Sequence, residues 1–376
     1  MQPMDSDVKH PPETLAPGIE PLEPRSTRTA PTRQRIRRRT GSGDRELDER
    51  IAQLVRDAPF PIADDDLLGQ SIESLFRMAR TANRGEMKLV ARSIRELGRA
   101  FRVFAPYRDR RKVSMFGSAR TDTTEPNYAV AREFAAAMVR EGWMVITGAG
   151  PGIMAAGHEG AGALQSFGVG IKLPIEQGAN GFIAGDPKLI DFKYFFTRKI
   201  TFMKESDAFV LLPGGYGTMD EAFELLTLMQ TGKTAIRPVL LLEAPGGTYW
   251  DEWLGFVRGH LIERGLCSPE DLALIEQCQS VEQSVAALKS FYVNYHSARY
   301  VGERLVIRLQ RAPSKAQLAA LNEAFADIVT RGRIERTHVS PAESHDGDAV
   351  DLARIAFYPR SNFGRIRQLI DALNRL

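Results

Sequence analysis

The fold is decided by the stretch FVLLPGGYGTMDE, which covers residues 209–221. Its first four residues are apolar and predict a short buried strand. The strand runs into three glycines and a threonine, and a helix is expected from there through Met229. A strand that enters a glycine-rich turn and then a helix is typical of the ligand-binding edge of an α/β sheet.

The residues on both sides of this stretch repeat the same alternation. Strands are predicted at residues 113–117, 144–147, 169–173, 189–196 and 239–242, with helices between them, one of which is expected from about Arg198. Short apolar strands that alternate with helices indicate a parallel sheet covered on both faces. We therefore predict an α/β fold, a doubly wound parallel sheet of the Rossmann-like kind, over residues 112–291.

Three other segments flank this predicted sheet. Residues 1–45 are rich in proline and arginine and are predicted to be a disordered basic tail. Residues 46–111 carry apolar side chains at helical spacing and predict a helical extension. Residues 299–376 predict a small α+β domain in the order βαββα, with strands at 305–309, 333–339 and 353–358, a helix at 314–329 and a closing helix at 362–373. We expect it to serve oligomerisation or regulation.

The composition excludes several classes of protein. The chain has 376 residues and a net charge of +3, but seven arginines lie between residues 25 and 40 and leave a charge of −4 for the rest. No aromatic residue lies among these arginines, so we expect a solvated arm, and nucleic acid is not the expected partner. Contact of this arm with nucleic acid or an anionic membrane is the alternative. Two cysteines cannot form a disulfide framework. Without a long apolar run or a secretory signal, the expected location is cytoplasmic, with no membrane contact.

A first glycine-rich turn is predicted at TGAGPGIM, residues 147–154. Gly148, Gly150 and Gly152 follow a strand and open a helix, which suits close approach of an anionic ligand. The turn resembles the dinucleotide fingerprint, but Ile153 stands where that pattern has its third glycine. Nucleotide binding and an NAD-dependent oxidoreductase both remain open on this turn alone.

The second turn and the charged residues before it indicate a phosphate site. Gly214, Gly215, Gly217 and Thr218 would offer N–H donors to one phosphate at a helix start. Glu221 lies about one helical turn further on, either as a functional carboxylate or as an acid that favours the helix start.

Two cations precede this strand. Arg198 and Lys199 are expected at the start of a helix, where cations oppose the helix dipole. This conflict indicates an anionic partner; the alternative is a pair of surface cations.

Together these motifs resemble the LOG ("Lonely Guy") family, whose members are phosphoribohydrolases long described as lysine decarboxylases. The resemblance implies hydrolysis of nucleoside 5′-monophosphates, AMP and cytokinin riboside monophosphates among them, to free base and ribose 5-phosphate. It implies Arg198 and Glu221 as the catalytic pair, no cofactor and no metal, and a homodimer or larger homo-oligomer. The substrate-binding residues it implies are Ser118, Gly148, Gly150, Gly152, Met154, Lys199, Gly214, Gly215, Gly217 and Thr218.

The chain departs from the family pattern at two positions. Ala149 stands where many members have a glycine, and Ala155 where many bacterial members have a glutamate. The second departure bears on base or ribose specificity. The alternative to hydrolysis is a non-catalytic nucleotide-binding protein of the same fold, like the molybdenum-cofactor carriers. Free adenine after incubation with AMP would distinguish the two.

Overall fold

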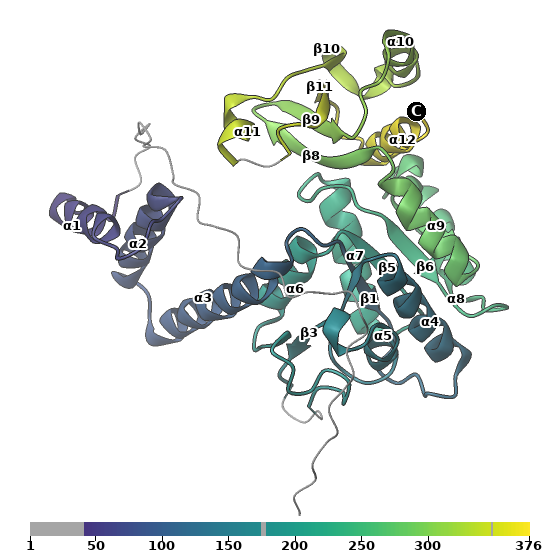
Figure 1. The fold of residues 1–376 in the computed structure, drawn as a ribbon, viewed down its shortest axis with the longest axis horizontal. Coiled ribbons are helices and arrows are strands. Elements are labelled where there is room, and N and C mark those ends of the chain that lie inside the picture. The colour runs from purple at the N-terminus through teal and green to yellow at the C-terminus, as the bar shows by residue number, and fades with distance from the viewer. Residues whose placement is uncertain (1–40, 174–177, 347–348) are drawn as a thin grey trace, which may run out of the picture. The chain divides into compact units, whose positions relative to one another are not determined.

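The computed structural model describes residues 41–173, 178–346 and 349–376 (Figure 1). Nearly all of the predicted basic tail therefore lies outside the described residues. The chain divides into two compact units, Met1–Leu89 and Val90–Leu376. The domain limits expected from the sequence stay predictions. None of the described helices combines the length and the hydropathy that a membrane span requires.

The first unit contains helices, as the periodicity predicts. They are α1 (Arg45–Arg56), α2 (Asp65–Ala79) and the start of α3 (Arg84–Phe104), which continues into the second unit. The side chain of Asp44 accepts the backbone N–H of Leu47 at 3.1 Å and so caps α1.

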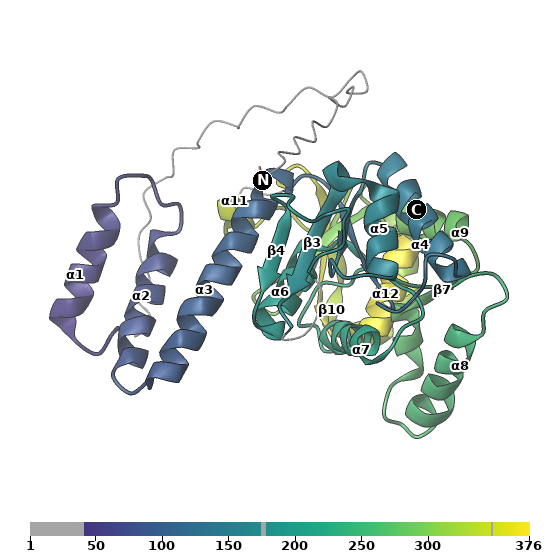
Figure 2. The same ribbon diagram turned by 90° about the horizontal axis from the view of Figure 1, so that it is seen from below.

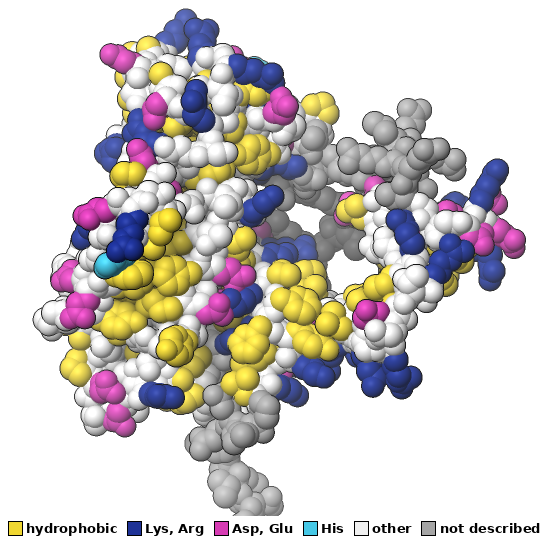
Figure 3. Space-filling model, turned by 180° about the vertical axis from the view of Figure 1, so that it is seen from behind, with side chains coloured by type: hydrophobic (Ala, Val, Ile, Leu, Met, Phe, Trp, Pro, Cys, Tyr) yellow, Lys and Arg dark blue, Asp and Glu magenta, His cyan; other side chains and the backbone are white. Residues whose placement is uncertain are grey.

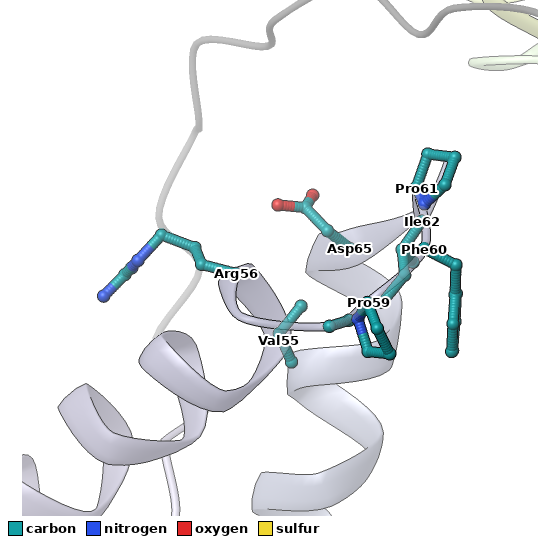
Figure 4. Close-up of a pocket in the computed structure, with 8 residues that line it drawn as sticks. Val55, Arg56, Pro59, Phe60, Pro61, Ile62 and Asp65 are labelled. Carbon is teal, nitrogen blue, oxygen red and sulfur yellow. The ribbon is translucent and has the colours of Figure 1, made fainter.

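The link between α1 and α2 borders a pocket of about 460 Å³ (Figure 4). Val55, Arg56, Phe60 and Asp65 are among its lining residues. These include none of the residues that the sequence motifs single out.

The second unit contains the predicted parallel sheet. Its seven strands lie in the order β4-β3-β2-β1-β5-β6-β7, and every neighbouring pair is parallel. They are β1 (Lys112–Phe116), β2 (Met144–Thr147), β3 (Ser166–Ile171), β4 (Leu189–Phe192), β5 (Ala208–Leu211), β6 (Val239–Leu242) and β7 (Glu276–Cys278). The direction of winding reverses at β1, between β2 and β5, which is where doubly wound sheets bind ligands.

Helices cover both faces of this sheet, and alternate strand residues enter two separate cores. Met115 and Val210 pack in the core under α4 (Pro126–Arg140), α5 (Ile153–Ala161) and α9 (Val281–Phe291). Phe116 and Phe209 pack in the core under α6 (Phe195–Glu205), α7 (Tyr216–Gln230) and α8 (Tyr249–Phe256). Figure 2 shows α4 and α5 on the opposite side of the sheet from α6 and α7. The doubly wound α/β prediction is confirmed.

The helix expected from about Arg198 begins three residues earlier, at Phe195. The aromatic pair Phe195 and Phe196 extends the apolar pattern of β4 and so predicted a longer strand. In the structure β4 ends at Phe192, and both aromatic rings are about half exposed on α6. Arg198 is therefore the fourth residue of α6 rather than its first, and its conflict with the helix dipole is smaller than the sequence suggested.

A second, antiparallel sheet follows, with the strand order β10-β11-β9-β8. Its elements are β8 (Tyr295–Val301), β9 (Arg304–Leu309), α10 (Lys315–Ala324), β10 (Val329–Arg336), α11 (Pro341–Asp346), β11 (Ala353–Pro359) and α12 (Phe363–Asn374). The sequence analysis missed β8, an edge strand whose side chains are mostly half-buried and mix polar with apolar residues. The helix predicted through Val329 ends at Ala324, because a 3₁₀ turn and the start of β10 follow.

Candidate active site

Three loops meet at the carboxyl ends of the adjacent strands β2, β1 and β5, and Ser118 joins them. The backbone N–H of Ser118 donates to the carbonyl of Pro213 at 3.1 Å, and its own carbonyl accepts the N–H of Ile153 at 3.0 Å. Ser118 thus links the glycine turn after β2 to the one after β5. The two motifs, which lie about sixty residues apart in the chain, border one site at the reversal point of the sheet.

Asn180 braces the first glycine turn. Its side-chain amide donates to the carbonyls of Ala149 and Gly150 at 3.1 and 2.9 Å. His158, fully buried behind the turn, contacts Asn180 and Thr147, and burial lowers its pKa. The sequence analysis missed both residues, because no motif marks them. Ala149 adopts a left-handed φ of 64°, so its methyl group is accommodated at a position that favours glycine.

The second glycine turn leads into α7. A side chain on Gly214 would collide with the hydroxyl of Thr218 and lie 2.9 Å from the backbone nitrogen of Ser118, so the fold requires glycine there. Side chains on Gly215 and Gly217 would meet nothing within 4 Å among the described atoms. The start of α7 is therefore open at these two positions. The N–H groups of Thr218 and Met219 donate to the carbonyl of Gly215, both at 3.1 Å, while the N–H groups before them precede the first helical hydrogen bond. Such a helix start favours an anion.

Glu221 lies on the buried face of α7, where an apolar side chain would be expected. It is only 5% exposed, and the other buried residues of this helix are Thr218, Ala222, Leu225 and Met229. Within the described residues, its Oε2 has no hydrogen-bond partner. Burial raises the pKa of this carboxyl to about 7; the cations of Lys199 and Arg198 oppose the rise, and Glu224 and Asp220 add to it.

Arg198 and Lys199 reach the site from α6. The Nε of Arg198 donates to the carbonyl of Val169 at 2.9 Å. Its guanidinium group lies next to Gly148, since a side chain at Gly148 would collide with Nη2. The Nζ of Lys199 pairs with Asp220 Oδ2 at 2.8 Å and Glu224 Oε2 at 2.6 Å.

Met154 completes the surroundings of the first turn. Side chains on Gly148 and Gly150 would lie 2.7 Å from its Sδ and 2.6 Å from its Cε, respectively. Gly152 has a φ of 64°, and a side chain there would collide with the carbonyl of Ser118. The structure thus gathers the sequence-predicted residues around the ends of β1, β2 and β5, while the ammonium group of Lys199 is engaged by α7. Their roles toward a ligand stay predictions.

Glu96 of α3 anchors the start of α6 and was also missed by the sequence analysis. Its carboxylate accepts the N–H of Lys193 at 2.8 Å and the hydroxyl of Thr197 at 2.7 Å, and it pairs with Arg92 at 2.7 Å. Burial acts to raise its pKa, but these hydrogen bonds outweigh it and lower the pKa. Thr197 directly precedes Arg198, so Glu96 helps to fix the position of that arginine.

The described residues contain no group of three or more His, Cys, Asp or Glu side chains arranged to hold a metal ion. The site itself offers a buried carboxylate, a guanidinium group and an open helix start. This combination suits an anionic ligand with a reacting centre next to Glu221.

The fold defines a parallel α/β protein, and its candidate site lies where the winding of the sheet reverses. Residues 154–288 match the family model described as "Possible lysine decarboxylase". The LOG resemblance indicated by the motifs is confirmed, at moderate identity and over part of the chain.

Two relatives illustrate this similarity. The probable cytokinin riboside 5′-monophosphate phosphoribohydrolase LOGL3 of Oryza sativa subsp. japonica is 36% identical over 99 residues, which cover 26% of this chain and 44% of that protein. The probable enzyme LOG6 of Arabidopsis thaliana, of the same description, is 33% identical over 135 residues, which cover 36% of this chain and 64% of that protein. The match therefore spans less than half of the first relative and just under two thirds of the second.

A solved structure of the molybdenum cofactor carrier protein from Chlamydomonas reinhardtii superposes with a TM-score of 0.34 and 21% identity. The superposed region covers 48% of this chain and 96% of the carrier protein.

Proposed function

We propose that this protein hydrolyses the N-glycosidic bond of a nucleoside 5′-monophosphate and releases the free base and ribose 5-phosphate. AMP and cytokinin riboside monophosphates are the first candidate substrates. The observation that carries the proposal is Glu221: a buried carboxylate with an unpartnered oxygen, flanked by two cations and next to an open helix start. A buried acid in such a position is costly for stability, so it is expected where chemistry needs it.

The 5′-phosphate would bind at the start of α7. The N–H groups around Gly215 and Gly217 and the hydroxyl of Thr218 would donate to its oxygens. The loop that begins at Gly148 would then line the nucleoside, with Arg198 beside it. Because the phosphate holds one end of the substrate, the sugar is oriented toward Glu221.

The chemical step is a displacement by water. The bond between C1′ and the base nitrogen breaks and its electron pair goes to the base, while positive charge develops on the ribose ring. The carboxylate of Glu221 stabilises this charge and accepts a proton from the attacking water, whose oxygen bonds to C1′. That proton is passed to the departing base, so water is divided between the two products. A carboxyl with a pKa of about 7 suits such a base at neutral pH.

The named activity of the relatives supports this proposal. The rice and Arabidopsis relatives are described as probable cytokinin riboside 5′-monophosphate phosphoribohydrolases. The family-model match of residues 154–288 includes Arg198, the second glycine turn and Glu221. These relatives support hydrolysis as the reaction class. Whether the protein prefers AMP or a cytokinin precursor is decided by the substrate comparison below.

We further propose that two copies of the chain associate through α6 and α7. Phe195, Phe196 and Ile200 on α6 and Tyr216 and Phe223 on α7 are 40% to 96% exposed. Figure 3 shows hydrophobic side chains gathered on one face of the molecule. Apolar side chains clustered on neighbouring helices are typical of an interface. Light scattering should give the mass of a dimer or larger, and Ile200→Glu should reduce it to that of one chain; a monomeric wild type would contradict this.

The activity is tested by incubating the protein with AMP, other nucleoside monophosphates and the matching nucleosides, followed by chromatography of the products. Release of base and ribose 5-phosphate from the monophosphates, with little from the nucleosides, is the expected result. Glu221→Gln should lower turnover at least about a hundredfold while AMP still binds. The matched control is Glu323→Gln, which changes an exposed acid on α10 and should leave turnover unchanged.

Two outcomes would contradict the proposed function. Tight AMP binding without release of adenine would favour the non-catalytic nucleotide-binding alternative. Full activity in Glu221→Gln would remove the mechanism.

A further inference from the structure

Lys199 makes an ionic bridge between the two helices that carry the candidate catalytic pair. It lies on α6, next to Arg198, yet its ammonium group reaches α7 and lies 2.8 Å from Asp220 Oδ2 and 2.6 Å from Glu224 Oε2. Its side chain is only 13% exposed. The Glu224 side chain is 34% exposed and that of Asp220 is 59% exposed. The pair with Glu224 is therefore screened less by solvent than a fully exposed pair, and the pair with Asp220 is screened more.

The two carboxylates that hold Lys199 lie on either side of Glu221 in the sequence. Asp220 precedes it directly, and Glu224 follows three residues later, which brings it to the neighbouring position on the helix surface. Three carboxylates within five residues repel one another. The cations that face Glu221 are Lys199 and Arg198, both from α6, and the anions are Glu224 and Asp220 of its own helix.

We propose that Lys199 is a positioning residue, whose ammonium group ties α6 to α7 and favours the ionised form of the Glu221 carboxylate. This role differs from the substrate contact that the sequence motif implies. It rests on the proposed function of Glu221 as the base in the hydrolysis. Lys199 acts through Glu221 and through the spacing of the helices.

The direction of each substitution follows from the charges. Removing the cation in Lys199→Met leaves Glu221 among two carboxylates and one fewer cation, so its pKa rises. Removing one neighbouring anion in Glu224→Gln lowers the pKa, while Asp220 still holds Lys199. Lys199→Arg keeps the charge and serves as the matched control. A nearby opposite charge typically changes a carboxyl pKa by about one unit or more.

The test is the pH dependence of kcat/KM for nucleoside monophosphate hydrolysis in the wild type and these three variants. The acidic limb should move up by about one pH unit in Lys199→Met and down in Glu224→Gln, and stay in place in Lys199→Arg. Below the limb, Lys199→Met should lose about tenfold in rate, and above the limb most of this loss should disappear. A uniform loss of rate with all limbs unchanged would overturn the proposal, because it would indicate a merely structural contact.

A second readout does not require activity. The side-chain carboxyl of Glu221 is followed by ¹³C NMR during a pH titration of labelled protein, with its signal assigned from Glu221→Gln. The same opposite shifts are expected in Lys199→Met and Glu224→Gln. If Lys199→Met does not fold, Glu224→Gln alone decides: an unmoved titration midpoint refutes the inference. If the wild type hydrolyses no nucleotide, the proposed function is refuted. The NMR titration then still tests whether Lys199 lowers the pKa of Glu221.

Discussion

Glu221→Gln should stabilise the folded protein at alkaline pH and leave its stability unchanged at acidic pH. Burial raises the pKa of Glu221 from 4.5 to about 7 in the folded state. Between these two values the folded protein holds a proton that the unfolded chain has lost, so its stability falls as the pH rises through this window. A difference of about 2.5 pKa units corresponds to a loss of roughly 3 kcal/mol in the free energy of unfolding. This loss is complete above about pH 7. Glutamine carries no charge and avoids this cost.

Thermal unfolding of the wild type and the variant from pH 5 to pH 8.5 measures this effect. The melting temperature of Glu221→Gln should exceed that of the wild type by about 5 °C at pH 8, and the difference should nearly vanish at pH 5. Glu323→Gln, at an exposed position, should show no such dependence. A variant with the same or a lower melting temperature at pH 8 would refute the reasoning that Glu221 is buried as a costly carboxylate.

Four more substitutions test the loops and their supports. Gly214→Ala should abolish activity and lower the melting temperature, because its methyl group collides with Thr218. Gly215→Ala should melt like the wild type and raise the KM for monophosphates. Equal effects of the two substitutions would contradict the different roles assigned to these glycines. Glu96→Gln should lower kcat several-fold through a less well fixed α6, measured in the hydrolysis assay beside its melting curve, and unchanged kcat would exclude the anchoring role. Ala149→Gly should relieve the strain of a left-handed backbone and stabilise the protein by up to about 1 kcal/mol. The measurement is the melting temperature, which should rise. A fall in melting temperature would show that Ala149 is not strained.

Much of the fold could be read from local patterns. A buried parallel strand is apolar throughout, so β2, β5 and β6 were predicted to within about a residue at each end. The strand β8 was not predicted, because its half-buried edge position leaves a mixed pattern of polar and apolar residues. The start of α6 was misplaced for a related reason: Phe195 and Phe196 are apolar in sequence but half exposed in the structure.

The sequence by itself determined the parallel α/β architecture and the two glycine turns, because short-range spacing controls strands, turns and helix starts. It pointed to Arg198 and Glu221 as a catalytic pair only through the family resemblance, and this role stays a prediction. Only the tertiary structure decided that Glu221 is buried with an unpartnered oxygen, that Lys199 bridges to α7, and that Glu96 and Asn180 support the site. These contacts join elements far apart in the chain. The burial and charge that they create around Glu221 depend on packing, which no local pattern of residues specifies.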